Sequence, residues 1–490
     1  MRVYLNIFEA SFPIVYFNKY NDNAWITKGI RISCKKKKIL YLLNRNCNNP
    51  KLKSYYTHYC LILRKTIREA KRQYYNELIL NSENKVKATW KIIKKLTKKQ
   101  QHSRQMFPPL KVDDKEQPPN KVAQIIKNYY LNIPGNLKIQ ATKNNDFISL
   151  LETHYPYVFP PIQIVPVTEG EKSGIINTMK PKNSWVYDGI STKILKLCGS
   201  QISKPLTFII DKSLKTGVFP ERLKCAVVTP LHKRGDVSDI ANYRPISLLP
   251  AFSKILEKIM HSRLYQHLQT NNILTTEQYG FRKGLSTEQA TYSLTNNILM
   301  AWNKKIPIGA IFCDLTKAFN CVNHDILIAK LEHYGMQDTT LNWFKSYFID
   351  SKQRIKINVN RNQTHYSTWE TVKQGVPQGS VLGPLLFIMY MNDLAKSTSY
   401  DFKVILFADD RSVLVMDKDY TKFKRKMNLA LTSLDRWFSA NQLMLNITKT
   451  SIIKFTPKTT VQVPLGISYK NYVFDEANST KFLGILHIYR

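Results

Sequence analysis

The sequence is poor in acidic residues and in glycine. Of its 490 residues only 35 are Asp or Glu, against 73 Lys or Arg, which leaves a formal net charge of +38 at pH 7. A surplus of this size draws polyanions to a protein, so nucleic acid is the expected partner, ahead of an anionic membrane. The 17 glycines, together with 43% hydrophobic residues, exclude a collagen-like or wholly disordered chain and indicate a globular one.

The cysteines follow no metal-binding or disulfide pattern. Their number is odd and no two are spaced as Cys-X-X-Cys; they are Cys34, Cys47, Cys60, Cys198, Cys225, Cys313 and Cys321. We therefore expect neither a zinc site nor a disulfide framework, and a reducing, intracellular compartment. Long apolar runs are also lacking, because the longest, Val381–Met391, is about 11 residues and too short to cross a bilayer. We expect no signal peptide, since Glu9 interrupts the first apolar stretch.

Basic residues are concentrated towards the N-terminus. The stretch Tyr55–Lys99 alternates apolar and basic positions at helical spacing, without Pro or Gly, and predicts amphipathic helices. These helices are either simply solvated or track the phosphates of a nucleic acid, a contact that does not depend on base sequence. Further on, the pattern predicts helices near Ser191–Leu197, Ser203–Thr216 and Phe252–Thr270, and a strand at Cys225–Pro230.

Two acidic segments lie far apart in the sequence. Asp314 ends the apolar run Ile308–Cys313, which predicts a buried strand, and the pair Asp409-Asp410 stands between two apolar runs that predict a β-hairpin. An Asp pair in a turn is often ordinary turn chemistry. Carboxylates gathered at strand ends also repel one another unless cations lie between them. Two Mg²⁺ ions shared by such carboxylates form the clamp used for in-line phosphoryl transfer.

A glycine- and proline-punctuated loop, Gln374–Pro384, lies between the acidic segments and leads into a predicted apolar helix, Leu385–Leu394. With it the chain carries seven ordered blocks that resemble the reverse transcriptases of non-LTR retrotransposons, in particular the insect jockey-like elements. The blocks are NYRPISLL (242–249), YGFRKGLST (279–287), FCDLTKAFNCVNHDIL (312–327), QGVPQGSVLGPLLF (374–387), FADD (407–410), LNITKT (445–450) and FLGI (482–485).

The resemblance implies catalytic and nucleotide-binding roles for single residues. The metal ligands would be Asp314, Asp409, Asp410 and the backbone carbonyl of Leu315, and the ions two Mg²⁺, with Mn²⁺ as an alternative. Lys449 would protonate the leaving pyrophosphate. Lys233 and Arg244 would hold the incoming triphosphate, a role that suits a lysine charge and an arginine fork. Phe319 would exclude the ribose 2′-hydroxyl, and Gln378 and Gly379 would position template and nucleotide.

Template and primer contacts are the weaker part of the resemblance. Arg282 matches a template-contacting position, although its side chain could equally cap a helix C-terminus. Phe482, Leu483 and Gly484 match the primer grip. Taken singly, Lys233 and Lys449 are ordinary surface lysines and Phe319 an ordinary core aromatic.

The fold implied is α+β: a right-hand polymerase fold in which an antiparallel palm sheet packs on helices beside mainly helical fingers. We expect a basic, mainly helical segment over 1–104, a proline-rich linker over 105–172, the start of the fingers or pre-polymerase helices over 173–213 and the reverse transcriptase domain over 214–490. The thumb is expected to be largely absent, and the family's endonuclease to belong before the N-terminal segment.

The function implied is that of an RNA-directed DNA polymerase with RNA template, DNA primer or target and dNTPs as partners, without a membrane, in cytoplasm and nucleus. Two alternatives stay open: a truncated or inactive copy that at most binds RNA, and an RNA-dependent RNA polymerase. Two departures from the family bear on activity, Asn320 where Asp is usual and Arg411 where Thr or Ser is usual. Because side chains alternate along a strand, we expect Arg411 to point to the side of Asp409 and pair with it.

Overall fold

The computed structural model describes residues 25–45, 49–96, 107–108, 110–112, 115–136, 146–360, 363–397, 402–455, 466–469 and 472–488, with positions 7 and 10–11. Cys47 lies outside these ranges. The chain divides into two compact units, Met1–Met106 and Phe107–Arg490. None of the helices in the described ranges combines the length and apolarity needed to cross a membrane.

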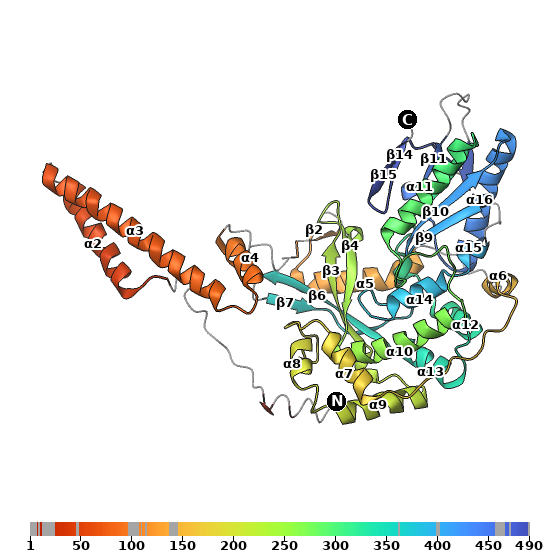
Figure 1. The fold of residues 1–490 in the computed structure, drawn as a ribbon, viewed down its shortest axis with the longest axis horizontal. Helices are drawn as coiled ribbons and strands as arrows, with labels where there is room; N and C mark the ends of the chain where they lie inside the picture. The colour runs from red at the N-terminus through yellow and green to blue at the C-terminus, as the bar shows by residue number, and fades with distance from the viewer. Residues whose placement is uncertain are drawn as a thin grey trace. The chain divides into compact units, whose positions relative to one another are not determined.

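The first unit contains a helical hairpin. Helix α2 (Lys28–Arg45) lies along α3 (Pro50–Leu80), and α4 (Lys85–Leu96) follows (Figure 1). Asn49 caps α3 with its side chain, and Pro50 occupies the first turn, where its missing N–H costs no hydrogen bond. The helices predicted within Tyr55–Lys99 are confirmed as far as Leu96. Few side chains of the hairpin are buried, and its long basic faces remain open to solvent.

The prediction of a proline-rich linker over 105–172 is wrong, because much of this stretch is folded into helices. Helix α5 (Pro119–Asn136) packs against β6 and β7 and buries an apolar row that includes Ile126 and Ile133. Lys127 donates from Nζ to Thr368 Oγ1 at 3.0 Å and to Glu370 Oε2 at 3.1 Å. Pro118 and Pro119 mislead because they stand at the start of the helix, where proline is tolerated.

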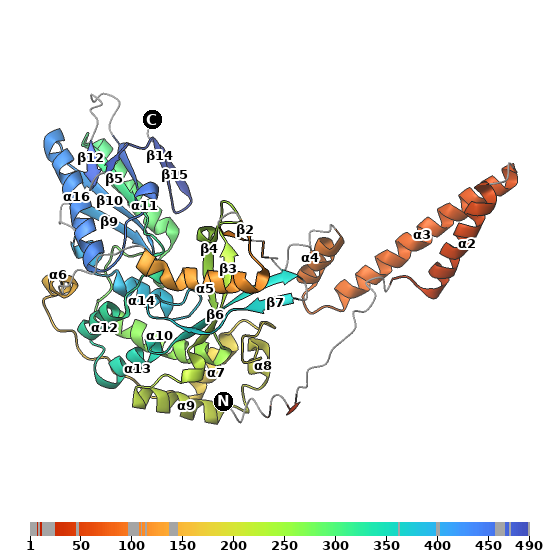
Figure 2. The same cartoon turned by 180° about the vertical axis from the view of Figure 1, so that it is seen from behind.

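A four-stranded antiparallel sheet forms the centre of the second unit, in the order β11-β5-β10-β9. Its strands are β5 (Ile308–Cys313), β9 (Phe402–Phe407), β10 (Asp410–Met416) and β11 (Ser451–Phe455). Helices α11 (Thr287–Asn303) and α16 (Tyr420–Ala440) cover its two faces (Figures 1 and 2). Ile308, Ala310 and Phe312 join the core beneath α11. A side chain at Gly309 would instead meet Met427 of α16, with its Cβ 2.7 Å from the sulfur.

A second sheet has the order β4-β3-β6-β7, with β8 paired to β6. Strands β3 (Cys225–His232) and β4 (Tyr243–Leu248) form an antiparallel hairpin, and β6 (Lys352–Asn360) runs parallel to β3. The predicted strand at 225–230 is therefore confirmed, as are the three helices near it. They are α8 (Thr192–Leu197), α9 (Ser203–Thr216) and α10 (Ala251–Thr270).

The mixture of helices and sheets confirms the α+β class. The predicted apolar helix at 385–394 is present, but it begins two residues earlier and ends at Tyr390, as α14 (Gly383–Tyr390). The other elements are β1 (Lys111–Val112), β2 (Lys115–Glu116), α6 (Asp146–His154), α7 (Glu169–Thr178), α12 (His324–His333), α13 (Asp338–Phe348), β7 (Gln363–Tyr366), β8 (Glu370–Thr371), α15 (Leu394–Ser397), β12 (Ile467–Tyr469), β13 (Tyr472–Phe474), β14 (Ser479–Phe482) and β15 (Ile485–Ile488).

The loop before α14 approaches β4 so closely that one position requires glycine. Ser247 N–H donates to the Gln378 carbonyl at 2.7 Å, and a Cβ on Gly379 would lie 2.6 Å from the Ser247 carbonyl oxygen. Gly379 also has φ +118°, a conformation that side chains disfavour. We expect Gly379→Ala to lower the free energy of unfolding by about 2–4 kcal/mol, measured by urea denaturation.

Gly284→Ala is the matched control for this prediction. Gly284 also has a positive φ, +82°, but a Cβ there would meet nothing within 4 Å. The control therefore carries backbone strain alone, and we expect it to cost about 1–2 kcal/mol. Equal losses in the two variants would contradict the clash with Ser247.

Candidate active site

The pairing of β5 with β10 brings the acidic segments together. Arg411 lies opposite Cys313 in this pairing, so Asp314, just after β5, and Asp410, the first residue of β10, share one end of the sheet. The predicted hairpin is confirmed: Asp410 pairs with Phe407, and the two residues between them form its turn. Ala408 in that turn has φ +55°, and its N–H donates to the Gln278 side chain at 3.0 Å. The turn that carries Asp409 is thus fixed by a buried amide.

The three carboxylates interact electrostatically. Burial raises the pKa of Asp410, and the charges of Asp409 and Asp314 raise it further. No group of three or more His, Cys, Asp or Glu side chains within the described ranges converges closely enough to hold a metal ion. The three carboxylates are thus close enough to affect one another's charge without forming a closed ligand cage.

The oxygen ligands available at this end of the sheet suit a hard divalent cation such as Mg²⁺. Besides the carboxylates, the backbone offers the Leu315 carbonyl. Thr316 N–H donates to the Met444 carbonyl at 3.1 Å, and Asn446 N–H donates to the Asp314 carbonyl at 2.8 Å, so neither of these two bonds uses the Leu315 carbonyl. The residues present thus fit a divalent metal by their chemistry.

Cations predicted to bind the nucleotide lie beside the carboxylates. Lys449 Nζ is 3.4 Å from Asp314 Oδ2, in a partly exposed ion pair. Lys233 and Arg244 come from the β3–β4 hairpin. Burial lowers the pKa of Lys233. The positive charges of Arg244 and Lys449 lower it further, whereas the negative charge of Asp314 raises it. The structure therefore brings Lys233, Arg244, Lys449 and Asp314 within electrostatic reach of one another.

Lys317 is a member of this group that sequence reasoning missed. Its Nζ donates to the carbonyls of Ala241 and Tyr243, at 2.7 and 3.4 Å. Burial lowers the pKa of Lys317 most, and the positive charge of Lys449 lowers it further. Its place three residues after Asp314 was the only sequence signal, and a lysine in a polar loop is usually solvated.

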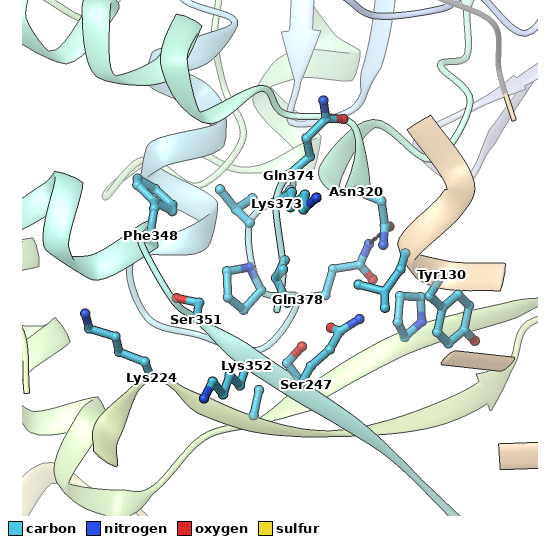
Figure 3. A pocket seen from close by; sticks show the side chains of 18 of the residues that line it. Tyr130, Lys224, Ser247, Asn320, Phe348, Ser351, Lys352, Lys373, Gln374 and Gln378 are labelled. Carbon is cyan, nitrogen blue, oxygen red and sulfur yellow. Dashed lines mark hydrogen bonds between the residues drawn. The ribbon is translucent and has the colours of Figure 1, made fainter. Parts of the chain in front are cut away.

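Phe319 and Gln378 face different surroundings. The Phe319 ring stacks on Phe387 of α14, with centroids 4.1 Å apart and an interplanar angle of 13°. Gln378 Nε2 donates to Asn320 Oδ1 at 3.5 Å, inside a cavity of about 300 Å³ that Lys224 and Lys352 also line (Figure 3). The amide of Gln378 is therefore directed towards Asn320, the residue that replaces the usual Asp.

The residues matched to template and primer contacts hold local structure. Arg282 Nη1 donates to the carbonyls of Thr275 and Gln278, at 2.6 and 3.3 Å, in the loop that follows α10. Phe482 is buried against Phe312 in the core. Leu483 and Gly484, both with positive φ, make the turn between β14 and β15. Contacts of these residues with nucleic acid stay a prediction.

The expected ion pair between Arg411 and Asp409 is wrong. Arg411 is 1% exposed and lies on the α16 side of β10, with its guanidinium carbon 5.5 Å from the centroid of the Phe438 ring. Within the part of the chain that the structure describes, none of its three guanidinium nitrogens has a hydrogen-bond partner. Burial lowers the pKa of Arg411, while Cys313 and the carboxylates, Asp409 first among them, raise it. Its charge thus acts on the carboxylates without a direct bond.

Comparisons with known proteins identify the fold family. The family model described as reverse transcriptase (RNA-dependent DNA polymerase) matches residues 231–487. The chain is 30% identical over 444 residues to a probable RNA-directed DNA polymerase from transposon BS of Drosophila melanogaster, covering 86% of this chain and 47% of that protein. It is 25% identical over 328 residues to the RNA-directed DNA polymerase from mobile element jockey of Drosophila funebris, covering 66% of this chain and 35% of the relative.

These relatives are longer proteins, and the chain spans less than half of the length of either. The matched region contains both strands of the acidic site and the β3–β4 hairpin from residue 231 onward. It confirms the resemblance carried by the seven sequence blocks. The chain belongs to the reverse transcriptase family, among the members found in non-LTR retrotransposons.

Proposed function

We propose that the chain is an RNA-directed DNA polymerase, which extends the 3′-hydroxyl of a DNA primer with dNTPs on an RNA template. The observation that carries this proposal is the β5–β10 register, because it sets Asp314 beside Asp409 and Asp410 at one end of the sheet. Lys233 and Arg244 stand close by on another hairpin. A carboxylate group next to a basic group suits the transfer of a phosphoryl group from a polyphosphate.

In this proposal the four-stranded sheet with α11 and α16 is the palm of a right hand, and the β3–β4 hairpin with its helices belongs to the fingers. The carboxylates at the end of the palm would then face the fingers hairpin. The charge of Asp314, which raises the pKa of Lys233, supports that arrangement. The RNA template, DNA primer, dNTPs and a site of action in cytoplasm and nucleus follow as parts of the same proposal.

Asp314, Asp409, Asp410 and the Leu315 carbonyl would hold Mg²⁺, two ions in the two-metal form of this chemistry. A metal held by these residues would lower the pKa of the attacking hydroxyl and neutralise charge on the leaving pyrophosphate. Lys233 and Arg244 bind the triphosphate through charge-assisted hydrogen bonds. Lys449, whose ammonium pairs with Asp314, would donate a proton to the leaving group. Phe319, held by its stack on Phe387, opposes a 2′-hydroxyl by its bulk and favours dNTPs over NTPs.

A second candidate function is nucleic-acid binding without catalysis. The specific observation in its favour is Arg411, a buried cation beneath the carboxylates where the family usually has Thr or Ser. Its charge weakens the attraction of this site for a divalent metal. Metal-dependent dNTP incorporation by the purified chain separates the two functions, and parallel reactions with NTPs separate DNA synthesis from RNA synthesis.

Replacing Asp409 with Asn should abolish incorporation while leaving folding intact. The change removes one charged metal ligand without changing the size of the side chain. The transition state then loses several kcal/mol of stabilisation, which corresponds to about a 10³-fold loss of rate. The measurement is primer extension on an RNA template, with urea denaturation to check folding. Asp350→Asn is the matched control, because Asp350 is exposed and its positive φ of 56° suits Asn. Full activity in the Asp409 variant would remove the mechanism.

Replacing Arg411 with Thr should lower the Mg²⁺ concentration for half-maximal incorporation by about threefold or more. A cation beneath the carboxylates competes with the metal through its field, and its removal restores the full negative charge. The midpoint is measured at saturating primer, and a parallel Mg²⁺ titration of thermal unfolding reports binding without turnover. Arg354→Thr is the control, since Arg354 packs over Tyr366 and Trp369 instead. An unchanged midpoint would show that Arg411 has no effect on the metal.

The α2–α3 hairpin is proposed to bind the RNA backbone. Exchanging Arg64, Lys65 and Arg68 of α3 for Gln should weaken RNA binding equally for all sequences. It should also reduce the slope of log affinity against log salt by about 2, because each phosphate contact releases about 0.7 counterion on single strands. These three side chains are exposed, so folding should be unaffected.

The control for this prediction removes the same charge elsewhere. Lys204, Lys212 and Lys215 are also exposed, on α9. Changing them to Gln should leave the salt slope unchanged. If both triple variants alter the slope alike, the hairpin is a solvated surface and the effect is one of net charge.

A further inference from the structure

Lys317 connects two hairpins that are remote in the sequence. Its ammonium donates to the carbonyls of Ala241 and Tyr243, which flank Asn242 where the connecting loop of the β3–β4 hairpin enters β4. The carbonyl of Asn242 itself accepts from Lys233 N–H at 2.9 Å. Three successive carbonyls thus receive hydrogen bonds from two lysines, one of the hairpin and one of the loop that follows Asp314. The position of Lys233 is therefore tied to the position of Lys317.

The backbone at Lys317 is held in a costly conformation. Its φ of 48° is in the left-handed region, which costs a residue other than Gly or Asn about 1–2 kcal/mol. The residue begins the 3₁₀ turn Ala318–Asn320, which carries Phe319. Such strain persists only where surrounding contacts compensate for it. The two hydrogen bonds of the ammonium are contacts that can compensate for it, together with the bond from Asn320 N–H to the Lys317 carbonyl at 2.8 Å.

The ammonium also lies in a group of like charges. The cations of Lys449, Lys233 and Arg244 all act on Lys317, and Asp239 is the anion that acts on it in return. Cations gathered in this way repel one another and form a receptor for an anion of high charge. Lys233 and Arg244 stand on the hairpin that Lys317 holds. The spacing of the whole group consequently depends on this one side chain.

We propose that Lys317 is a positioning residue for the nucleotide's triphosphate. It fastens the β3–β4 hairpin to the loop after Asp314, and so fixes where Lys233 and Arg244 stand relative to the reacting end of the sheet. The proposal rests on the proposed polymerase function for the identity of the anion. It does not require Lys317 to touch the nucleotide, because its hydrogen bonds are directed to the backbone.

Kinetics of three variants test this role. Lys317→Met removes the donor at similar length and should raise the KM for dNTP about tenfold, the effect of losing charge-assisted hydrogen bonds. It should change kcat and the affinity for primer–template by less than about threefold. Lys317→Arg retains a donor and should recover most of the loss. Lys305→Met is the control, since Lys305 is an exposed lysine whose φ of 56° is also left-handed.

Hydrogen–deuterium exchange of the full chain gives a readout that needs no turnover. Residues 233–243 should exchange faster in Lys317→Met than in the parent or in Lys305→Met, and dNTP should slow their exchange in the parent. If the chain makes no DNA, the proposed polymerase function is wrong, and the exchange measurement alone then tests whether Lys317 holds the β3–β4 hairpin. Unchanged exchange at 233–243 in Lys317→Met would contradict the positioning role of Lys317. An equal rise in the KM for dNTP and in the primer–template dissociation constant overturns it as well, because that pattern indicates a general structural role.

Discussion

Repulsion among three carboxylates is the constraint around which the second unit is built. Asp314, Asp409 and Asp410 would separate if their strands could slide, and the antiparallel register prevents it. A slip of one residue would turn every core side chain of β5 or β10 to the opposite face. Both faces are covered, by α11 on one side and α16 on the other, so neither slip is tolerated. The apolar core thus holds together a charged site that would not assemble by itself.

One of these covering helices, α16, is in turn joined to α12 and to the end of α14 through a buried ion pair. Lys330 of α12 and Asp393, after α14, are both fully buried and lie 2.6 Å apart between Nζ and Oδ1. Trp437 of α16 donates from its indole to Asp393 Oδ2 at 2.8 Å, and the ammonium of Lys330 also lies 4.8 Å from the Trp437 ring centroid. Removing one partner of such a pair costs about 3–5 kcal/mol, because the other charge is left buried. This network specifies how three helices meet, which apolar contacts alone do less sharply.

Sequence reasoning could predict elements with regular apolar patterning and turns with familiar residues. The strand before Asp314, the hairpin at Asp409-Asp410 and α10 are of this kind. It failed at α5, whose flanking prolines resemble those of a linker. It also failed at Arg411. The alternation of side chains along a strand tells which face of the sheet a residue points to only once the residue at which the strand begins is known. Lys317 could not be found by pattern, since its hydrogen bonds join residues more than 70 positions apart.

Arg411 and Lys317, the two charged residues that sequence reasoning misjudged or missed, both belong to the charged group around the carboxylates. Lys449, Lys233, Arg244 and Lys317 interact with one another near Asp314, and the buried Arg411 interacts with all three carboxylates. Burial and neighbouring cations lower the pKa of Lys233 and of Lys317, and burial lowers the pKa of Arg411. These cations outnumber the three carboxylates, so the side chains at this end of the sheet carry an excess of positive charge. A ligand that brings several negative charges relieves that excess and stabilises the fold by mass action. Under the proposed function, that ligand is the triphosphate of the incoming nucleotide.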